Sequence, residues 1–198
     1  MLVIADNHSC GGSLIHPNII LTAAHCPEPY AIRIGNSDIS GTDTLIPKPC
    51  VQFVEHPGWD PTTIQNDYAL CYLPVDVLIN DDDVKLEISF DNSFLDHGDM
   101  LRTIGLGLTA YPVVNNSPEL PDTLQFLDLP YVDFDTCSEY YGPPNWPPPN
   151  SPDVFVDEET MLCAGFQEGG KASCFGEFHI PITRQSIGLF IRLTALRL

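Results

Sequence analysis

Short apolar runs, three to seven residues long and bounded by turn residues, recur along most of this chain. They occupy residues 13–15, 19–22, 31–34, 51–54, 68–73, 101–106, 123–129 and 161–164. Their length and their content of β-branched residues favour strands over helices. The pattern therefore predicts an all-β fold, either a barrel or a sandwich.

Two segments interrupt this pattern. Residues 80–99 are acidic and weakly patterned, which suits a linker between two lobes. Residues 140–152, with the sequence YYGPPNWPPPNSP, contain six prolines, so they cannot form a central strand and indicate an extended surface loop.

Composition limits the class of protein. The chain has 198 residues, 43% of them hydrophobic, which is enough for one domain or two small lobes with a real core. It carries 8 Lys and Arg against 27 Asp and Glu, a formal charge of −19. Nucleic acid or an anionic membrane would repel such a chain, so neither is expected as a partner.

The charge is unevenly distributed. Residues up to 177 carry −22, whereas residues 178–198 carry +3 and no acidic side chain. This tail has the sequence FHIPITRQSIGLFIRLTALRL, and it reads either as a basic amphipathic anchor or as a non-native end; we favour the second interpretation.

Seven cysteines indicate an oxidising compartment. No two of them show the C-x-x-C spacing of a zinc site, so disulfides are the better interpretation. Two glycosylation sequons, at Asn7 and Asn115, are compatible with secretion. No signal peptide and no apolar run of transmembrane length is present, so we expect an extracellular protein with residues missing before Met1.

The most informative segment is CGGSLIHPNIILTAAHC, from Cys10 to Cys26. A lone histidine in an apolar run is usually a core or surface residue. Here, Cys26 directly follows His25, and Cys10 lies sixteen residues before Cys26. These two cysteines could link the strands of a hairpin and hold the imidazole at a strand end as a general base. This element resembles that of the chymotrypsin/trypsin-like serine peptidases, and the resemblance extends over residues 9–176.

The resemblance implies a fold of two six-stranded antiparallel barrels. It places a nearly complete first lobe at residues 1–90, a partial second lobe at 91–177 and a non-family tail at 178–198. The sequence Asn66-Asp67-Tyr68-Ala69-Leu70 matches the family's NDIAL, which implies that Asp67 orients His25 and stabilises its charged form. As written, the second lobe cannot close and would expose strand edges.

The nucleophile is missing from this pattern. The family's GKDSCxGDSGGP corresponds to Gly-Lys-Ala-Ser-Cys-Phe-Gly-Glu-Phe-His-Ile-Pro at residues 170–181. Gly176 matches the oxyanion-hole glycine, and Phe178 stands at the position of the nucleophilic serine. Ala172 stands where trypsin-type members carry the pocket aspartate, which implies a preference for apolar or small side chains.

The resemblance also implies disulfide pairs. It joins Cys10 to Cys26 and Cys137 to Cys163. Cys50 and Cys71 are not usual family positions, but they fall on expected neighbouring strands of the first lobe, so we hypothesise a third bridge between them. Cys174 is then left unpaired.

Three classes of function remain. The first is an incomplete serine endopeptidase homologue acting on proteins or peptides, monomeric and inactive as given because Phe178 has no hydroxyl. The second is a pseudo-peptidase that binds a protein partner. The third, a zinc or calcium module, has only scattered His and Asp residues in its favour, and Asp81-Asp82-Asp83 reads as a solvated turn. We expect no metal and no cofactor.

Overall fold

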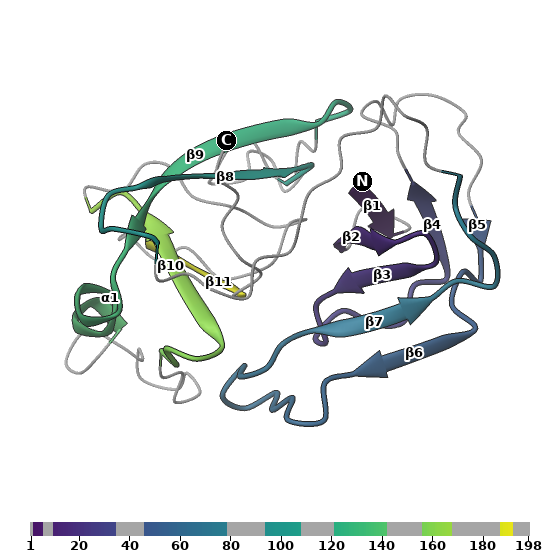
Figure 1. Ribbon diagram of the computed structural model, residues 1–198, viewed down its shortest axis with the longest axis horizontal. Coiled ribbons are helices and arrows are strands. Elements are labelled where there is room, and N and C mark those ends of the chain that lie inside the picture. Colours follow the sequence, from purple (N-terminus) through teal and green to yellow (C-terminus); the bar gives the residue numbers. More distant parts are fainter. Residues whose placement is uncertain are drawn as a thin grey trace, which may run out of the picture.

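The computed structural model describes residues 2–5, 10–34, 46–78, 94–107, 121–141, 156–167 and 187–191, with the backbone alone described at 2–5 and 187–191. Within these ranges the chain forms two antiparallel sheets, which occupy opposite halves of the view in Figure 1. No helix in the described part is long and apolar enough to cross a membrane.

The first sheet contains seven strands within the described ranges. They are β1 (Leu2–Ala5), β2 (Gly11–His16), β3 (Ile19–Thr22), β4 (Ala31–Ile34), β5 (Ile46–Pro47), β6 (Gln52–Glu55) and β7 (Ala69–Tyr72). Their order across the sheet is β5-β4-β1-β2-β3-β7-β6. Because β5 and β6 follow one another in the chain yet lie at opposite ends of this order, the sheet curls round as in a barrel.

The bend between β5 and β6 is made by a Pro-Lys-Pro segment. Lys48 lies between Pro47 and Pro49 with a φ of 45°. Its N–H donates to the carbonyl of Tyr30 at 2.7 Å, and the N–H of Val51 donates to the carbonyl of Tyr72 at 2.8 Å. The chain thereby leaves β4 and joins β7 within a few residues.

The second sheet contains four strands in the described part, in the order β11-β10-β9-β8. These are β8 (Met100–Gly105), β9 (Gln125–Val132), β10 (Met161–Gly165) and β11 (Ile187–Ile191). The helix α1 (Phe134–Tyr141) follows β9 and lies at the far end of this lobe in Figure 1.

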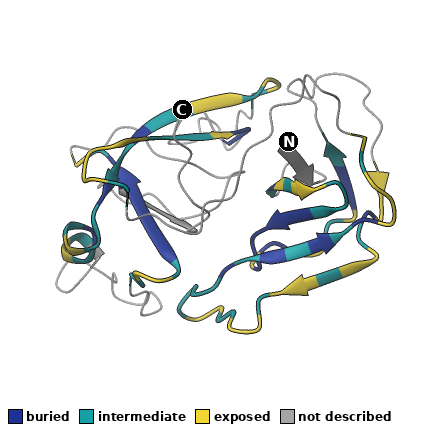
Figure 2. Cartoon of the chain, in the orientation of Figure 1, coloured by how far each residue is buried: buried dark blue, intermediate teal, exposed yellow. Residues whose placement is uncertain are grey.

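Both lobes have an apolar core. Ile20, Ile32, Cys71 and Leu73 form a buried cluster in the first lobe, and Leu129, Leu162 and Ala164 form one in the second. Residues alternate between buried and half-buried along β7, as expected for a strand with one face on the core. In contrast, all five residues of β10 are buried, which is visible as the dark ribbon of that lobe in Figure 2.

The sequence pattern does not predict α1. Its N-terminus is capped by Asp133, whose carboxylate accepts from the Thr136 N–H at 2.8 Å and from the Thr136 hydroxyl at 3.1 Å. The Thr136 N–H is the main cause that lowers the pKa of Asp133, and a neighbouring His97 adds to it. This local cap and the packing of Cys137 and Tyr140 against the second-lobe cluster hold a helix of only eight residues.

The predicted all-β, antiparallel, trypsin-like fold is confirmed. The described strands number seven in the first sheet and four in the second, where the resemblance implied six in each lobe. β11 lies in the tail that we expected to be foreign to the family, and it pairs with β10 along residues 161–165. The expected lobe boundaries, at residues 90 and 177, lie outside the described residues, as do most of the linker and of the proline-rich loop.

Candidate active site

His25 lies in the turn that follows β3. The preceding Ala23 and Ala24 are buried, and the N–H of Cys26 donates to the carbonyl of Ala23 at 3.3 Å. The Thr22 hydroxyl donates to the carbonyl of Gly11 at 2.8 Å. A disulfide between Cys10 and Cys26 ties this turn to the start of β2, so the histidine backbone is held on both sides.

Asp67 lies beside His25, in the segment that comes just before β7. β3 and β7 are antiparallel neighbours in which Thr22 is opposite Ala69. The residues after Thr22 and those before Ala69 therefore leave the sheet at the same end. This register brings together two side chains that are 42 positions apart in the sequence.

Both carboxylate oxygens of Asp67 contact His25 closely. The Nδ1 atom of His25 lies 2.5 Å from Oδ2 of Asp67, and the backbone N–H of His25 donates to Oδ1 at 2.7 Å. Asp67 is 4% exposed, whereas the His25 side chain is 27% exposed. One carboxylate thus fixes both the backbone and the ring of the histidine.

This geometry has a chemical consequence. With a proton on Nδ1 donated to the carboxylate, Nε2 is the basic nitrogen of the ring. A buried carboxylate is costly unless it is hydrogen-bonded, and Asp67 is the one ionisable side chain that is buried in the described part of the chain. The pair is suited to accept a proton at Nε2 and to stabilise the imidazolium that results.

The loop before Asp67 is held by its own hydrogen bonds. Asn66, with a φ of 54°, donates from its side-chain amide to the carbonyl of Gly58 at 3.0 Å and accepts from the Tyr68 hydroxyl at 3.2 Å. These bonds fix the backbone on both sides of the carboxylate.

Ile64 also belongs to this arrangement, although no pattern in the sequence singles it out. This residue lies in the same loop with a φ of 61°, which is unusual for a β-branched side chain. Its side chain packs against the second-lobe cluster that contains Cys137 and Cys163. The loop that carries Asp67 is thereby anchored to the other lobe, and no local sequence signal indicates such a contact.

The site does not suit a metal ion. Ligand atoms of Cys10, His25 and Cys26 lie within 4.8 Å of one another in the described part. However, the two sulfurs are joined as a disulfide, so neither offers the thiolate that zinc requires. The acidic run at residues 81–83 lies outside the described residues.

Three disulfides are present among the described cysteines. They join Cys10 to Cys26, Cys137 to Cys163, and the unusual pair Cys50 to Cys71, whose Cα atoms are 5.2 Å apart. The other predicted site positions, Ala172, Cys174, Gly176 and Phe178, lie outside the described residues. The structure therefore brings together His25 and Asp67, the two residues that the sequence predicts as general base and orienting acid.

Comparison with known proteins agrees with this geometry. The family model described as Trypsin matches residues 1–177. A vitellin-degrading protease of Bombyx mori is 31% identical over 183 residues, which cover 90% of this chain and 63% of that protein. Trypsin-3 of Salmo salar is 31% identical over 179 residues (88% and 67%), and a trypsin of Squalus acanthias is 32% identical over 179 residues (88% and 69%). The chain thus spans somewhat under two thirds of the length of the Bombyx mori relative.

Proposed function

Because this chain belongs to the trypsin family, we propose that it is a serine-endopeptidase homologue that keeps the acid–base pair of His25 and Asp67 but lacks the nucleophile. The observation that carries the proposal is the doubled contact between Asp67 and His25. In peptide-bond hydrolysis by this family, a serine hydroxyl attacks the scissile carbonyl and passes its proton to Nε2 of the histidine.

The step that fails in this chain is the attack itself. Phe178 stands at the nucleophile position and has no oxygen that can form an acyl-enzyme. In a comparable triad, loss of the serine leaves a residual acceleration of about 10³–10⁴-fold over water from binding and oxyanion stabilisation. We therefore expect no acyl-enzyme and no measurable peptidase turnover from the chain as given.

The location, binding class and oligomeric state of such a protein are proposed on related grounds. Three disulfides support an extracellular location. Proteins or peptides are the expected binding class, as they are substrates of trypsin-like peptidases. Ala172 supports a preference for apolar or small side chains next to the scissile bond in a form that carries serine, and a monomer is the expected state.

A fluorophosphonate probe tests the proposal, because it reacts with an activated serine and needs no knowledge of the substrate. The purified chain, with its fold verified by amide-proton dispersion in NMR, is incubated with the probe beside active trypsin as a positive control. We expect labelling of trypsin alone. Labelling of this chain at any residue would overturn the inactive assignment.

A second candidate is a pseudo-peptidase that uses the scaffold for binding. It is favoured by phenylalanine at position 178, which removes the nucleophile but leaves the scaffold for binding. Sequencing the transcript across the codons for residues 174–181 separates the two. A continuation that encodes Asp-Ser-Gly-Gly-Pro points to an active parent enzyme, whereas an intact Phe178 frame points to the binding module.

A further inference from the structure

Asp67 is the central residue of a γ-turn. The N–H of Tyr68 donates to the carbonyl of Asn66 at 2.8 Å, which closes a hydrogen bond across a single residue. Asn66 itself has a φ of 54°, in the left-handed region that asparagine adopts more readily than most residues do. The direction of the Asp67 carboxylate is therefore set by the conformation of the two residues that flank it.

A closed circuit of contacts surrounds this turn, and we refer to its four residues, His56, Gly58, Asn66 and Tyr68, as the Asn66 cluster. The His56 ring accepts from the Gly58 N–H at 3.1 Å, and the Asn66 amide donates to the Gly58 carbonyl at 3.0 Å. The side-chain oxygen of Asn66 accepts from the Tyr68 hydroxyl at 3.2 Å. The circuit closes where the rings of Tyr68 and His56 meet, with their centroids 4.6 Å apart.

The Asn66 cluster leaves little room at Gly58. A Cβ atom at this position would lie 3.1 Å from Nδ2 of Asn66 and 3.3 Å from Nδ1 of His56, which is closer than ordinary van der Waals contact. The N–H and the carbonyl of Gly58 are both used within the cluster. The glycine thus gives the Asn66 side chain a close backbone partner, which a larger residue would push away.

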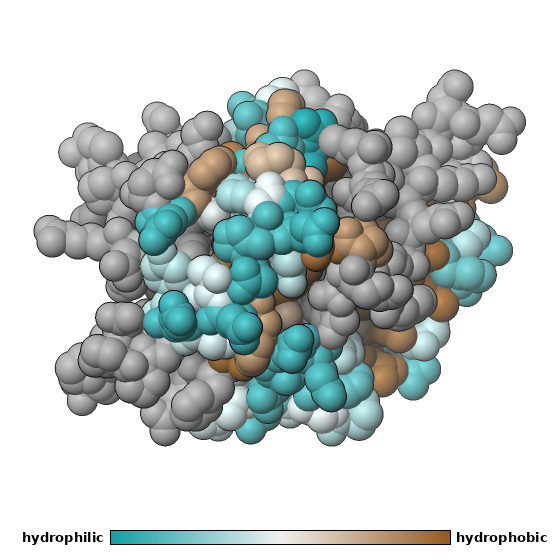
Figure 3. All heavy atoms as spheres, turned by 60° about the vertical axis from the view of Figure 1, so that its left-hand side comes forward, coloured by the Kyte–Doolittle hydropathy of each residue, from teal (hydrophilic) through white to brown (hydrophobic). Residues whose placement is uncertain are grey.

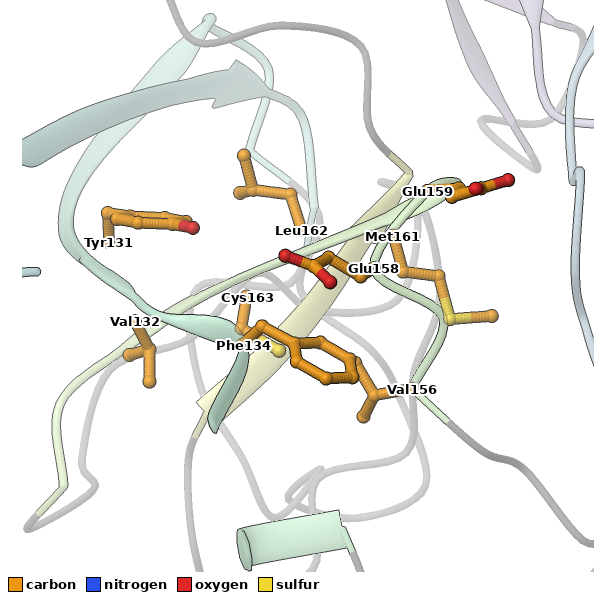
Figure 4. Close-up of a pocket in the computed structure, with 9 residues that line it drawn as sticks. All are labelled: Tyr131, Val132, Phe134, Val156, Glu158, Glu159, Met161, Leu162 and Cys163. Carbon is orange, nitrogen blue, oxygen red and sulfur yellow. The ribbon is translucent and has the colours of Figure 1, made fainter. Parts of the chain in front are cut away.

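Ile64 gives the same loop an apolar anchor. Its side chain packs against the second-lobe cluster, and Figure 4 shows Val132, Met161 and Cys163 of this cluster on β9 and β10. On the face of the second lobe in Figure 3, the described hydrophobic residues form only small areas among hydrophilic ones. The loop is therefore anchored to a buried cluster and not to a surface patch, and its polar side is left to the Asn66 cluster.

We propose that Asn66 and Tyr68 are positioning residues for the acid–base pair of His25 and Asp67. They act through the backbone, because the Asn66 cluster fixes the γ-turn and the turn places a carboxylate oxygen 2.5 Å from Nδ1 of His25. Such support matters because a displacement of about 1 Å at an orienting group can cost a factor of about 100 in rate. The proposal deepens the proposed function and rests on it for the role of the pair.

Tyr68 is a departure from the family's pattern. The family's NDIAL has isoleucine at this position, and isoleucine has no hydroxyl. The hydrogen bond from Tyr68 to Asn66 is therefore a contact that the NDIAL pattern does not supply. This makes the hydroxyl of Tyr68 the sharpest place to test the Asn66 cluster.

The effect can be measured on the neutral ring of His25. A carboxylate held at Nδ1 favours the tautomer that carries its proton on Nδ1. If the γ-turn moves, water competes for both groups, and the tautomer with the proton on Nε2 gains. The ratio of the two tautomers therefore reports how well Asp67 is placed, and one hydrogen bond changes such an equilibrium about two- to tenfold.

The test uses the full chain, uniformly ¹⁵N-labelled. Long-range ¹H–¹⁵N spectra, recorded at a pH where the rings are neutral, give the tautomer ratio from the shifts of the two ring nitrogens. A His25→Gln variant identifies the signals of this ring. Tyr68→Phe removes one hydroxyl and keeps the ring beside His56, and it should lower the ratio of the Nδ1–H to the Nε2–H tautomer about threefold. Asn66→Gly keeps the left-handed backbone and removes both side-chain bonds, and it should lower the ratio about tenfold.

Tyr72→Phe is the matched control. It makes the same chemical change at the end of β7, outside the Asn66 cluster, and should leave the tautomer ratio of His25 unchanged. The midpoint of urea unfolding shows whether each variant remains folded. A lower ratio in a folded Tyr68→Phe variant, with an unchanged ratio in Tyr72→Phe, is the expected result.

Two results would overturn the proposal. One is an unchanged tautomer ratio in Tyr68→Phe or in Asn66→Gly, which would show that the γ-turn holds the carboxylate without these side chains. The other is an equal decrease in Tyr72→Phe, which would show a general loosening of the first lobe. Neither result affects the fluorophosphonate experiment, and labelling by that probe would leave the tautomer ratios as they are, so the two proposals can fail separately.

Discussion

Replacement of both Cys50 and Cys71 by alanine removes the one disulfide that family resemblance does not supply. Cys71 is 1% exposed and belongs to the first-lobe core with Ile20 and Ile32, and Cys50 packs against that cluster. The double variant should be made in a Cys174→Ala background, so that no remaining thiol can exchange with the other two disulfides. The perturbation then affects a single cross-link.

The magnitude follows from the length of the closed loop. The two cysteines are 21 positions apart, and closing a loop of that size in the unfolded chain corresponds to about 3 kcal/mol. Loss of the buried Cys71 sulfur adds about 1 kcal/mol for lost packing. The expected decrease of about 4 kcal/mol is a large share of the roughly 5–15 kcal/mol by which a domain is usually stable.

Urea unfolding followed by tryptophan fluorescence measures this difference. Since the variant's unfolded chain is less constrained, the dependence of the unfolding free energy on urea should also become steeper. The matched control is a Cys10→Ala/Cys26→Ala variant, whose loop spans 16 positions. Loop entropy varies with the logarithm of length, so the cross-link contributions should agree within about 0.5 kcal/mol. A loss below about 1 kcal/mol at Cys50 and Cys71 would refute the loop-entropy reasoning.

The remaining predictions concern the site and two local features. Asp67→Asn should lower the unfolding free energy by about 2 kcal/mol and abolish the low-field NMR signal of the His25 Nδ1 proton; a retained signal would contradict the contact. Gly12→Ala places a Cβ 2.9 Å from a backbone oxygen of β3 and should cost about 1–3 kcal/mol in thermal denaturation, and a melting temperature equal to that of the unchanged chain would argue against this crowding. Asp133→Ala should cost about 1 kcal/mol at pH 7 through loss of the cap, whereas Asp133→Asn should restore most of it. Because the pKa of Asp133 is lowered in the fold, its charge stabilises the protein above the ordinary carboxyl pKa, and its advantage over asparagine should fade as the pH falls through the lowered value; an advantage that persists at lower pH would exclude this cause.

The sequence pattern predicts most strands because their information is local. The runs at residues 19–22, 31–34 and 161–164 correspond closely to β3, β4 and β10, since short apolar runs between turn residues are typical of buried strands. The pattern of apolar runs does not predict α1, because this helix is short and depends on its Asp133 cap and on the disulfide at Cys137. β11 was missed because the tail has no strand-like alternation and gains its structure by pairing with β10.

The sequence likewise predicts only part of the candidate site. The segment around His25 and the Asn-Asp-Tyr-Ala-Leu run around Asp67 are each contiguous, so both residues can be predicted as site residues from the sequence. That their side chains meet depends on the register of β3 against β7, which no local segment encodes. Likewise, the contact of Ile64 with the second-lobe cluster joins residues of separate elements, and the residue type alone gives no reason to expect it.

By itself, the sequence determined the fold class, the family resemblance and the absence of a hydroxyl at position 178. These properties follow from residue identity and from patterns of a few neighbouring positions. The tertiary structure alone decided that one carboxylate holds both the ring and the backbone of His25 and that the Asp67 loop is anchored to the second lobe. Contacts of this kind arise from strand register and side-chain packing, which bring residues together across more than forty positions.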